Sequence, residues 1–131
     1  MVTDPPMVPV SWGELIDKIT ILEIKCDRLR DPKAVANAAR ELAALSEAAA
    51  VLAPVPDGLA GARAALSAVN AALWEIEDAI REHEAKGDFG PDFIALARAV
   101  YQRNDERGRI KRAINVMLGS GFVEEKQYAA Y

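Results

Sequence analysis

The sequence is poor in cysteine, histidine and aromatic residues, and these shortages exclude several classes of protein. It contains one cysteine, one histidine and 6% aromatic residues. A single cysteine, Cys26, cannot form a disulfide within the chain, and its place in an apolar repeat is typical of a small core residue. No apolar run approaches the roughly 18 residues of a membrane span, and residues 1–10 lack the basic and apolar regions of a signal peptide. We therefore expect a cytoplasmic protein that does not bind a membrane.

The chain also lacks an excess of positive charge. Its 16 basic and 20 acidic side chains give a net charge of −4, which disfavours general binding to nucleic acid or to an anionic lipid surface. No nucleophile triad, glycine-rich phosphate loop or metal-ligand spacing is found, so we expect no metal and no cofactor. Whether the protein is an enzyme stays open at this point.

Alanine and an apolar repeat at helical spacing dominate what is present. The 25 alanines favour helices that approach closely, because alanine has high helix propensity and little volume. Apolar residues recur at alternating spacings of three and four in four segments. The expected helices are 12–30, 32–53, 59–87 and 91–118.

Helix-start and helix-stop signals separate these segments. Ser11 followed by Glu14 is a capping box, Asp31 and Asp57 are N-cap candidates, and a proline stands at position 91 after Gly90. The expected fold class is all-α, either a four-helix bundle or paired helical hairpins. We expect one domain over residues 1–131, with an extended arm at 1–10, a helical core at 11–121 and a short tail at 122–131.

Three polar residues interrupt the apolar stripe of the fourth segment. At about 100° per residue, Asn104, Arg107 and Lys111 fall in the gap between Val100 and Ile114, so they face inward. A buried cation requires a carboxylate partner, a bound anion or a water-filled crevice. Gly108, beside Arg107, indicates close helix packing or the close approach of a ligand.

Two interpretations of these inward charges remain open. In the structural one, Glu77 and Glu23 form an interhelical salt-bridge network with the cations at 107 and 111. In the functional one, the same set of residues lines a polar pocket between helices that binds a small anion. The candidate anion pocket consists of Asn104, Arg107, Lys111, Glu77 and Glu23.

The first segment is apolar on two faces. Ile21 and Ile24 lie opposite its main stripe, together with Asp17 and Arg28. A helix of this kind is either central in its domain or covered by a partner subunit. We expect a homodimer whose interface contains these four residues; the alternative is that the arm or the tail covers the second face.

The tail carries more aromatic and apolar residues than a disordered end does. We expect Phe122, Val123 and Tyr128 to pack back onto the helices or across the dimer. Glu124 or Glu125 would then meet the basic face of the fourth helix.

Three segments carry a resemblance to a known family. They read PVSWGELIDKITILEIK at 9–25, NDER at 104–107 and VEEKQY at 123–128. Together they resemble the motifs of a small bacterial family that is known only as a domain of unknown function. The resemblance covers nearly the whole chain and implies no activity.

A second, fainter resemblance concerns residues 15–19, which are similar to the first helix of the all-helical chorismate mutases. Gly13 stands where that family has an arginine, and Pro32 ends the helix early. The resemblance would make Arg28, Arg107 and Lys111 ligands of a dianion.

From the sequence we expect a non-catalytic homodimeric helical binding or adaptor protein, with a small anionic ligand or a protein as partner. The alternative is a small enzyme that acts on an anionic metabolite, similar to a chorismate mutase or a helical pyrophosphohydrolase.

Overall fold

The computed structural model describes residues 3–122 and 125–131, and its regular elements are four helices. The all-α expectation is confirmed. The helices are α1 (Trp12–Arg28), α2 (Pro32–Ala49), α3 (Leu59–Lys86) and α4 (Pro91–Met117).

Local signals account for most helix ends. The Ser11 side chain accepts a hydrogen bond from the Glu14 backbone N–H at 3.1 Å, and Asp31 caps α2 in the same way. The cap of α3 is Gly58, not the expected Asp57, and no side chain caps that end. Helix α2 ends at Ala49, four residues before the expected position, because the chain must leave the helix before Pro54.

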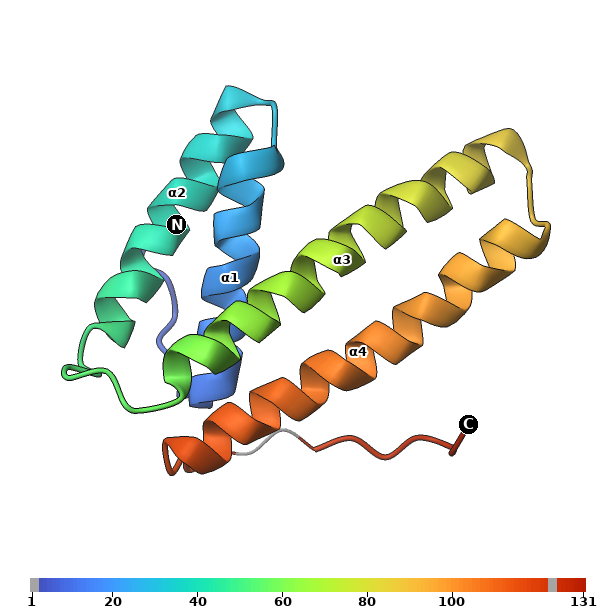
Figure 1. The fold of residues 1–131 in the computed structure, drawn as a ribbon. Helices are drawn as coiled ribbons and strands as arrows, with labels where there is room; N and C mark the ends of the chain where they lie inside the picture. The colour runs from blue at the N-terminus through green and yellow to red at the C-terminus, as the bar shows by residue number, and fades with distance from the viewer. Residues whose placement is uncertain (1–2, 123–124) are drawn as a thin grey trace.

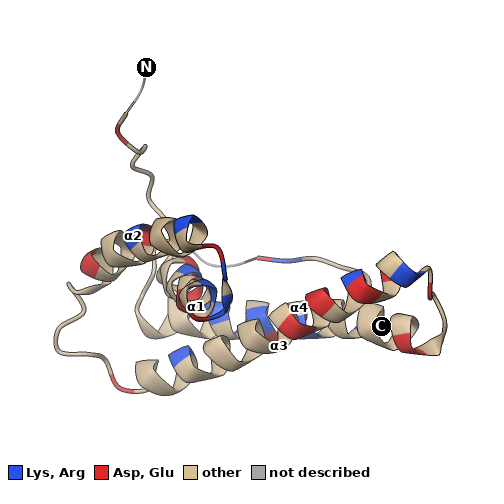
Figure 2. Ribbon diagram, turned by 90° about the horizontal axis from the view of Figure 1, so that it is seen from above, with Lys and Arg blue, Asp and Glu red and all other residues tan. Residues whose placement is uncertain are grey.

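The helices form two antiparallel hairpins, the second of the two expected architectures. Helix α1 contacts the other three helices, whereas α2 packs on α1 and on neither helix of the α3–α4 hairpin. Figure 1 shows the α1–α2 hairpin crossing one end of the longer α3–α4 hairpin. Figure 2 shows that α1 and α2 lie on the same side of that hairpin, with α1 between α2 and α3–α4.

The hydrophobic core lies where α1 crosses the hairpin. Its buried cluster consists of Ile16, Ile19, Leu59, Leu66 and Ile114. The buried residues of α3 lie between positions 59 and 70, and those of α4 between 108 and 115. The rest of the hairpin projects beyond α1, as Figure 1 shows.

The second apolar face of α1 is covered within the chain, which corrects the expected dimer interface. Asp17 is 1% exposed and Ile24 is 9% exposed, because this face packs on α3 and α4. Ile21 is half-buried beside them, and Arg28 contacts Glu75 of α3 at 3.4 Å. Helix α1 is thus central in its domain, and Asp17 and Ile24 cannot belong to an exposed surface.

Within the described residues, no helix is long and apolar enough to cross a membrane.

Candidate functional site

A buried carboxylate, Asp17, is the centre of the polar contacts between α1, α3 and α4. The Arg107 Nε donates to Asp17 Oδ1 at 2.9 Å, and an Arg107 terminal nitrogen donates to Oδ2. Such two-point pairing is the strongest form of an arginine–carboxylate contact and fixes the orientation of both groups. The inward direction expected for Arg107 is confirmed.

An amide from α3 completes the environment of Asp17. The Asn70 Nδ2 donates to Asp17 Oδ1 at 2.9 Å and to the Thr20 hydroxyl at 3.0 Å. The Thr20 hydroxyl donates in turn to the Asp17 backbone carbonyl at 2.7 Å. Because an ionised carboxylate only accepts, the Asn70 atom that faces Asp17 must be the nitrogen, and its carbonyl oxygen points elsewhere.

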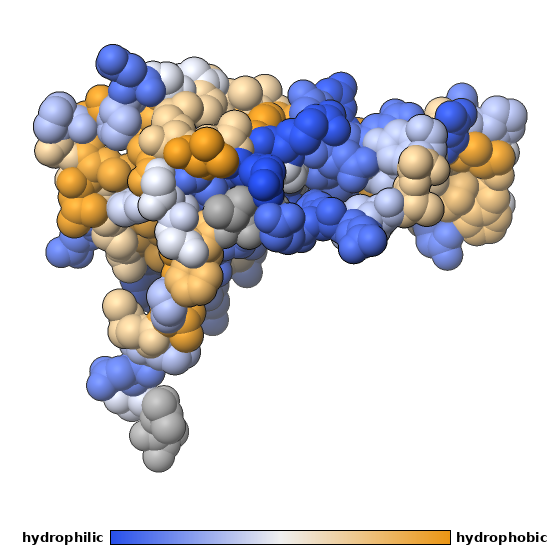
Figure 3. Space-filling model, turned by 90° about the horizontal axis from the view of Figure 1, so that it is seen from below, coloured by the Kyte–Doolittle hydropathy of each residue, from blue (hydrophilic) through white to orange (hydrophobic). Residues whose placement is uncertain are grey.

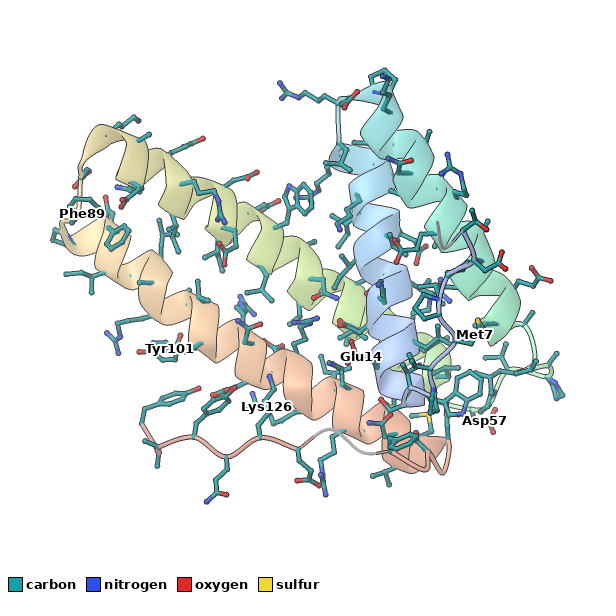
Figure 4. All side chains as sticks on the ribbon, turned by 180° about the vertical axis from the view of Figure 1, so that it is seen from behind. Met7, Glu14, Asp57, Phe89, Tyr101 and Lys126 are labelled. Atoms are coloured by element: carbon teal, nitrogen blue, oxygen red, sulfur yellow. The ribbon has the colours of Figure 1, made fainter. Side chains whose placement is uncertain are left out.

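Lys111 is the second inward cation, and it is 6% exposed. Its ammonium contacts Glu14 Oε2 at 2.8 Å and lies 4.0 Å from Asp17 Oδ2. Figure 4 shows Glu14 directed from α1 toward α4. Both inward cations of α4 therefore meet carboxylates of α1.

The prediction that Glu77 and Glu23 pair with these cations was wrong. Glu77 contacts Arg81 of its own helix at 2.6 Å, and Glu23 contacts Arg63 at 2.9 Å. Glu77 lies seven residues beyond Asn70 along α3, which is about 10 Å of helix. It therefore stands too far along the hairpin to take the place of Asp17.

A close approach of α1 and α4 depends on Gly13, which the sequence reasoning did not single out. The Gly13 N–H donates to Asn115 Oδ1 at 2.7 Å. A Cβ at Gly13 would lie 2.4 Å from the Lys111 carbonyl oxygen, so no larger residue fits without moving a helix. Gly108 has a looser surrounding, because a Cβ there would lie 3.4 Å from the Lys126 side chain.

An open cleft begins where α1 leaves the hairpin, and we call it the junction cleft. Its volume is about 460 Å³. It is lined by Ile21, Ile24, Asn70, Leu73, Trp74, Glu77, Asp78, Arg81, Asn104 and Arg107. It brings together three residues of the candidate anion pocket, at positions 77, 104 and 107. Lys111 and Glu23 do not line it.

The tail returns along α4, and one of its expected contacts is confirmed: Glu125 contacts Arg112 on the basic face at 2.7 Å. The other anchor was not expected, since the Tyr131 hydroxyl donates to Asp105 at 2.5 Å. This hydrogen bond raises the pKa of the Tyr131 phenol above its ordinary value. Phe122 and Tyr128 are both exposed.

Lys126 is a further contact between the tail and α4. Figure 4 shows Lys126 between the tail and α4, and its ammonium donates to the Asn104 carbonyl oxygen at 3.5 Å. The expected contacts of Val123 and Glu124 lie outside the described residues.

Among residues 3–122 and 125–131, no group of three His, Cys, Asp or Glu side chains could hold a metal ion.

Comparison with known proteins identifies the family of the chain. No curated protein and no solved structure matches it. A family model does match, over residues 7–131, in agreement with the motif resemblance of the sequence. The chain belongs to DUF6165, a family of unknown function.

Proposed function

We propose that the protein is a non-catalytic helical binding protein of the cytoplasm that works as a homodimer. Its self-association surface would be the part of the α3–α4 hairpin that projects beyond α1, residues 71–107, which we call the projecting arm. The observation that carries this proposal is that none of the residues from 71 to 107, all of which the structure describes, is buried.

The projecting arm carries more apolar side chains than two helices can cover. Half-buried apolar residues follow the inner faces of both helices: Leu73, Trp74, Ile76, Ile80, Phe93, Leu96 and Val100. Phe89 and Ile94 are more than half exposed. Figure 4 places Phe89 at the free end of the arm, and Figure 3 shows hydrophobic side chains gathered at that end. An apolar surface of this kind is typical of a protein interface.

A second copy of the chain is the partner that the charges of the arm favour. Within the arm, residues 82–92 at the free end carry four acids and one lysine, whereas residues 98–107, nearer α1, carry three bases and two acids. Two arms that pack antiparallel about a twofold axis therefore bring the acidic end of each beside the basic stretch of the other. The product is a four-helix bundle, in which each helix has the neighbours that one arm lacks.

The contacts of the inward polar residues favour binding over catalysis. Both Asp17 oxygens accept hydrogen bonds from Arg107, and Oδ1 accepts a second one from Asn70. A carboxylate held in this way has no oxygen directed at a substrate. The Lys111 ammonium contacts Glu14, and Arg28 contacts Glu75, so these cations do not converge on one anion. The enzyme alternative therefore receives no support from this arrangement.

Sedimentation equilibrium at micromolar concentration tests self-association. We expect a mass near twice the 14.2 kDa of the chain. Ile94→Glu, on the exposed surface of the arm, should give a folded monomer, because two new charges would be buried in the dimer. Val51→Glu is the control, since Val51 is also an exposed apolar residue but lies in the α2–α3 connection, and it should remain dimeric.

Charge reversal tests the antiparallel arrangement. Glu84→Lys and Arg98→Glu should each weaken the dimer, and the double variant should regain part of the lost affinity, because each end would again meet a stretch of opposite charge. A monomeric wild-type chain at micromolar concentration would refute the proposal. A dimer that Ile94→Glu leaves intact would refute the assigned surface.

A further inference from the structure

We infer that the junction cleft is a binding site for a small ligand that carries a protonated amine on an apolar body. The cleft is formed by residues of a single chain, and seven of its ten lining residues belong to the projecting arm. The inference does not rest on self-association, but a second arm packed over these residues would compete with the ligand. Its volume of about 460 Å³ lies in the range of small-molecule sites, which is roughly 300 to 1,000 Å³.

The floor of the cleft presents a hydrogen-bond acceptor. Asn70 is 6% exposed, and its Nδ2 is committed to Asp17 and Thr20. That commitment leaves the Asn70 carbonyl oxygen for the cleft, which Asn70 lines. Among the described residues, none donates a hydrogen bond to this oxygen. The oxygen is open to the cleft, so it can accept a hydrogen bond from a ligand there.

Two carboxylates and two guanidiniums line the cleft, and they differ in how they are paired. Arg107 contacts Asp17 beneath the cleft, and Arg81 contacts Glu77, so each guanidinium has a carboxylate beside it. Asp78 is the second lining carboxylate, and no described cation forms an ion pair with it. Asp78 is therefore the charge that a ligand cation would meet.

The unpaired acceptor of the cleft suits an ammonium group. A primary ammonium has three N–H donors and no acceptor. It could donate to the Asp78 carboxylate, whereas a ligand carboxylate or phosphate would place a second negative charge beside it. The Asn70 carbonyl oxygen lies about 12 Å from Asp78 along α3, so it would accept from a different donor of the ligand or from water.

The remaining wall of the cleft is apolar and suits the body of such a ligand. Ile21 and Ile24 contribute from α1, and Leu73 and Trp74 contribute from α3. Burial of an apolar body against these side chains supplies affinity, and an indole face also attracts a cation. This ligand class differs from the anion that the sequence predicted. Lys111, a predicted ligand of that anion, does not line the cleft. Asp78, which was not part of the prediction, does line it.

Three probes that share one apolar body test the charge of the ligand: phenethylammonium, 2-phenylethanol and 3-phenylpropionate. Each is titrated into the full chain, and NMR shifts of the Asn70 side-chain amide and the Trp74 indole N–H report binding in the cleft. We expect phenethylammonium to bind about tenfold more tightly than the alcohol, and 3-phenylpropionate to bind more weakly than both. Stronger binding of 3-phenylpropionate, or no shift of either group by phenethylammonium at millimolar concentration, would overturn the inference.

Variants separate the contributions of charge and of the apolar wall. Asp78→Asn should weaken phenethylammonium several-fold and leave the alcohol unchanged. Trp74→Ala should weaken both. Glu82→Gln is the matched control, an exposed acid one turn along α3 that does not line the cleft, and it should change neither affinity. Equal losses in Asp78→Asn and Glu82→Gln would mean that the amine is attracted only by the general charge of α3, which also contradicts the assigned site. Repeating the titration with Ile94→Glu keeps this result separate from self-association.

Discussion

The guanidinium of Arg107 contacts both oxygens of the buried Asp17 carboxylate, although the two residues are 90 positions apart in the chain. This pair joins the middle of α1 to α4, at the point where the α1–α2 hairpin crosses the longer hairpin. It is accompanied by the Asn70 amide from α3, so three helices share one polar centre. The crossing is therefore fixed by directional contacts in addition to the apolar core.

The first prediction concerns this pair. Arg107→Ala removes the cation that faces Asp17, which is 1% exposed, and leaves a buried carboxylate without its main partner. Breaking a buried ion pair on one side costs about 3 to 5 kcal/mol. Because the Arg107 side chain is itself 25% exposed, we expect a loss of about 3 kcal/mol in the free energy of unfolding, measured with urea.

Arg109→Ala is the matched control for this measurement. Arg109 lies two residues further along α4 and is exposed, so its removal should change stability by less than about 0.5 kcal/mol. Equal effects of the two substitutions would show that the Asp17–Arg107 pair contributes nothing specific.

The second prediction concerns the contact between α1 and α4. Gly13→Ala places a Cβ 2.4 Å from the Lys111 carbonyl oxygen, a backbone atom that cannot rotate away. We expect a net destabilisation of about 2 kcal/mol from overpacking, even though alanine is the better helix former. Thermal unfolding followed by circular dichroism measures the change.

Gly61→Ala, the same substitution in another helix, should have the opposite effect on stability. Gly61 lies in α3, and a Cβ there meets nothing within 4 Å. This substitution should stabilise the chain by up to about 1 kcal/mol, since only helix propensity changes. A stabilising Gly13→Ala would contradict the close approach of the two helices.

The third prediction concerns the anchors of the tail. Tyr131 donates to Asp105 and its ring lies 5.2 Å from that of Tyr101, whereas Tyr128, which is as exposed as Tyr131, forms neither contact with a described residue. Tyr131→Ala should therefore lower Tm by a few degrees, and Tyr128→Ala should leave it unchanged. If both variants melted as the wild type does, the return of the tail along α4 would not contribute to stability.

The fourth prediction is a pH dependence of the same contact. The hydrogen bond to the Asp105 carboxylate, followed by burial and the charge of Asp105, raises the pKa of Tyr131 above 10.0. The folded chain therefore favours the protonated phenol, so the contact is fully present below pH 10.0 and is lost as the pH rises through the raised pKa. Backbone ¹³C NMR shifts of residues 125–131, whose detection does not need amide protons, should move toward random-coil values over that range. In Tyr131→Phe these NMR shifts should not change over the same pH range. An identical pH dependence in the two proteins would exclude Tyr131 as the cause of the change.

The sequence by itself determined the four helices and the direction of several side chains. Apolar spacing and capping residues predicted α1 and α4 to within two residues at each end, because these signals act over a few positions of the same helix. The rotation of α4 also followed from spacing, so Arg107 and Lys111 were correctly predicted to face inward. The contact of Glu125 with the basic face of α4 was also predicted correctly, whereas the predicted packing of Phe122 and Tyr128 was wrong, because both are exposed.

Only the tertiary structure decided which residues meet. Helical periodicity gives the rotation of a residue about its axis, but not the position along the axis at which two helices cross. The choice between Glu77 and Asp17 as the partner of Arg107 depends on that position, and so does the requirement for glycine at position 13. The covering of the second face of α1 depends on it as well, because the two long helices supply the neighbours that a second subunit was expected to provide. Spacing within a helix is set by local backbone geometry, whereas a crossing point is set by the packing of all three helices at once.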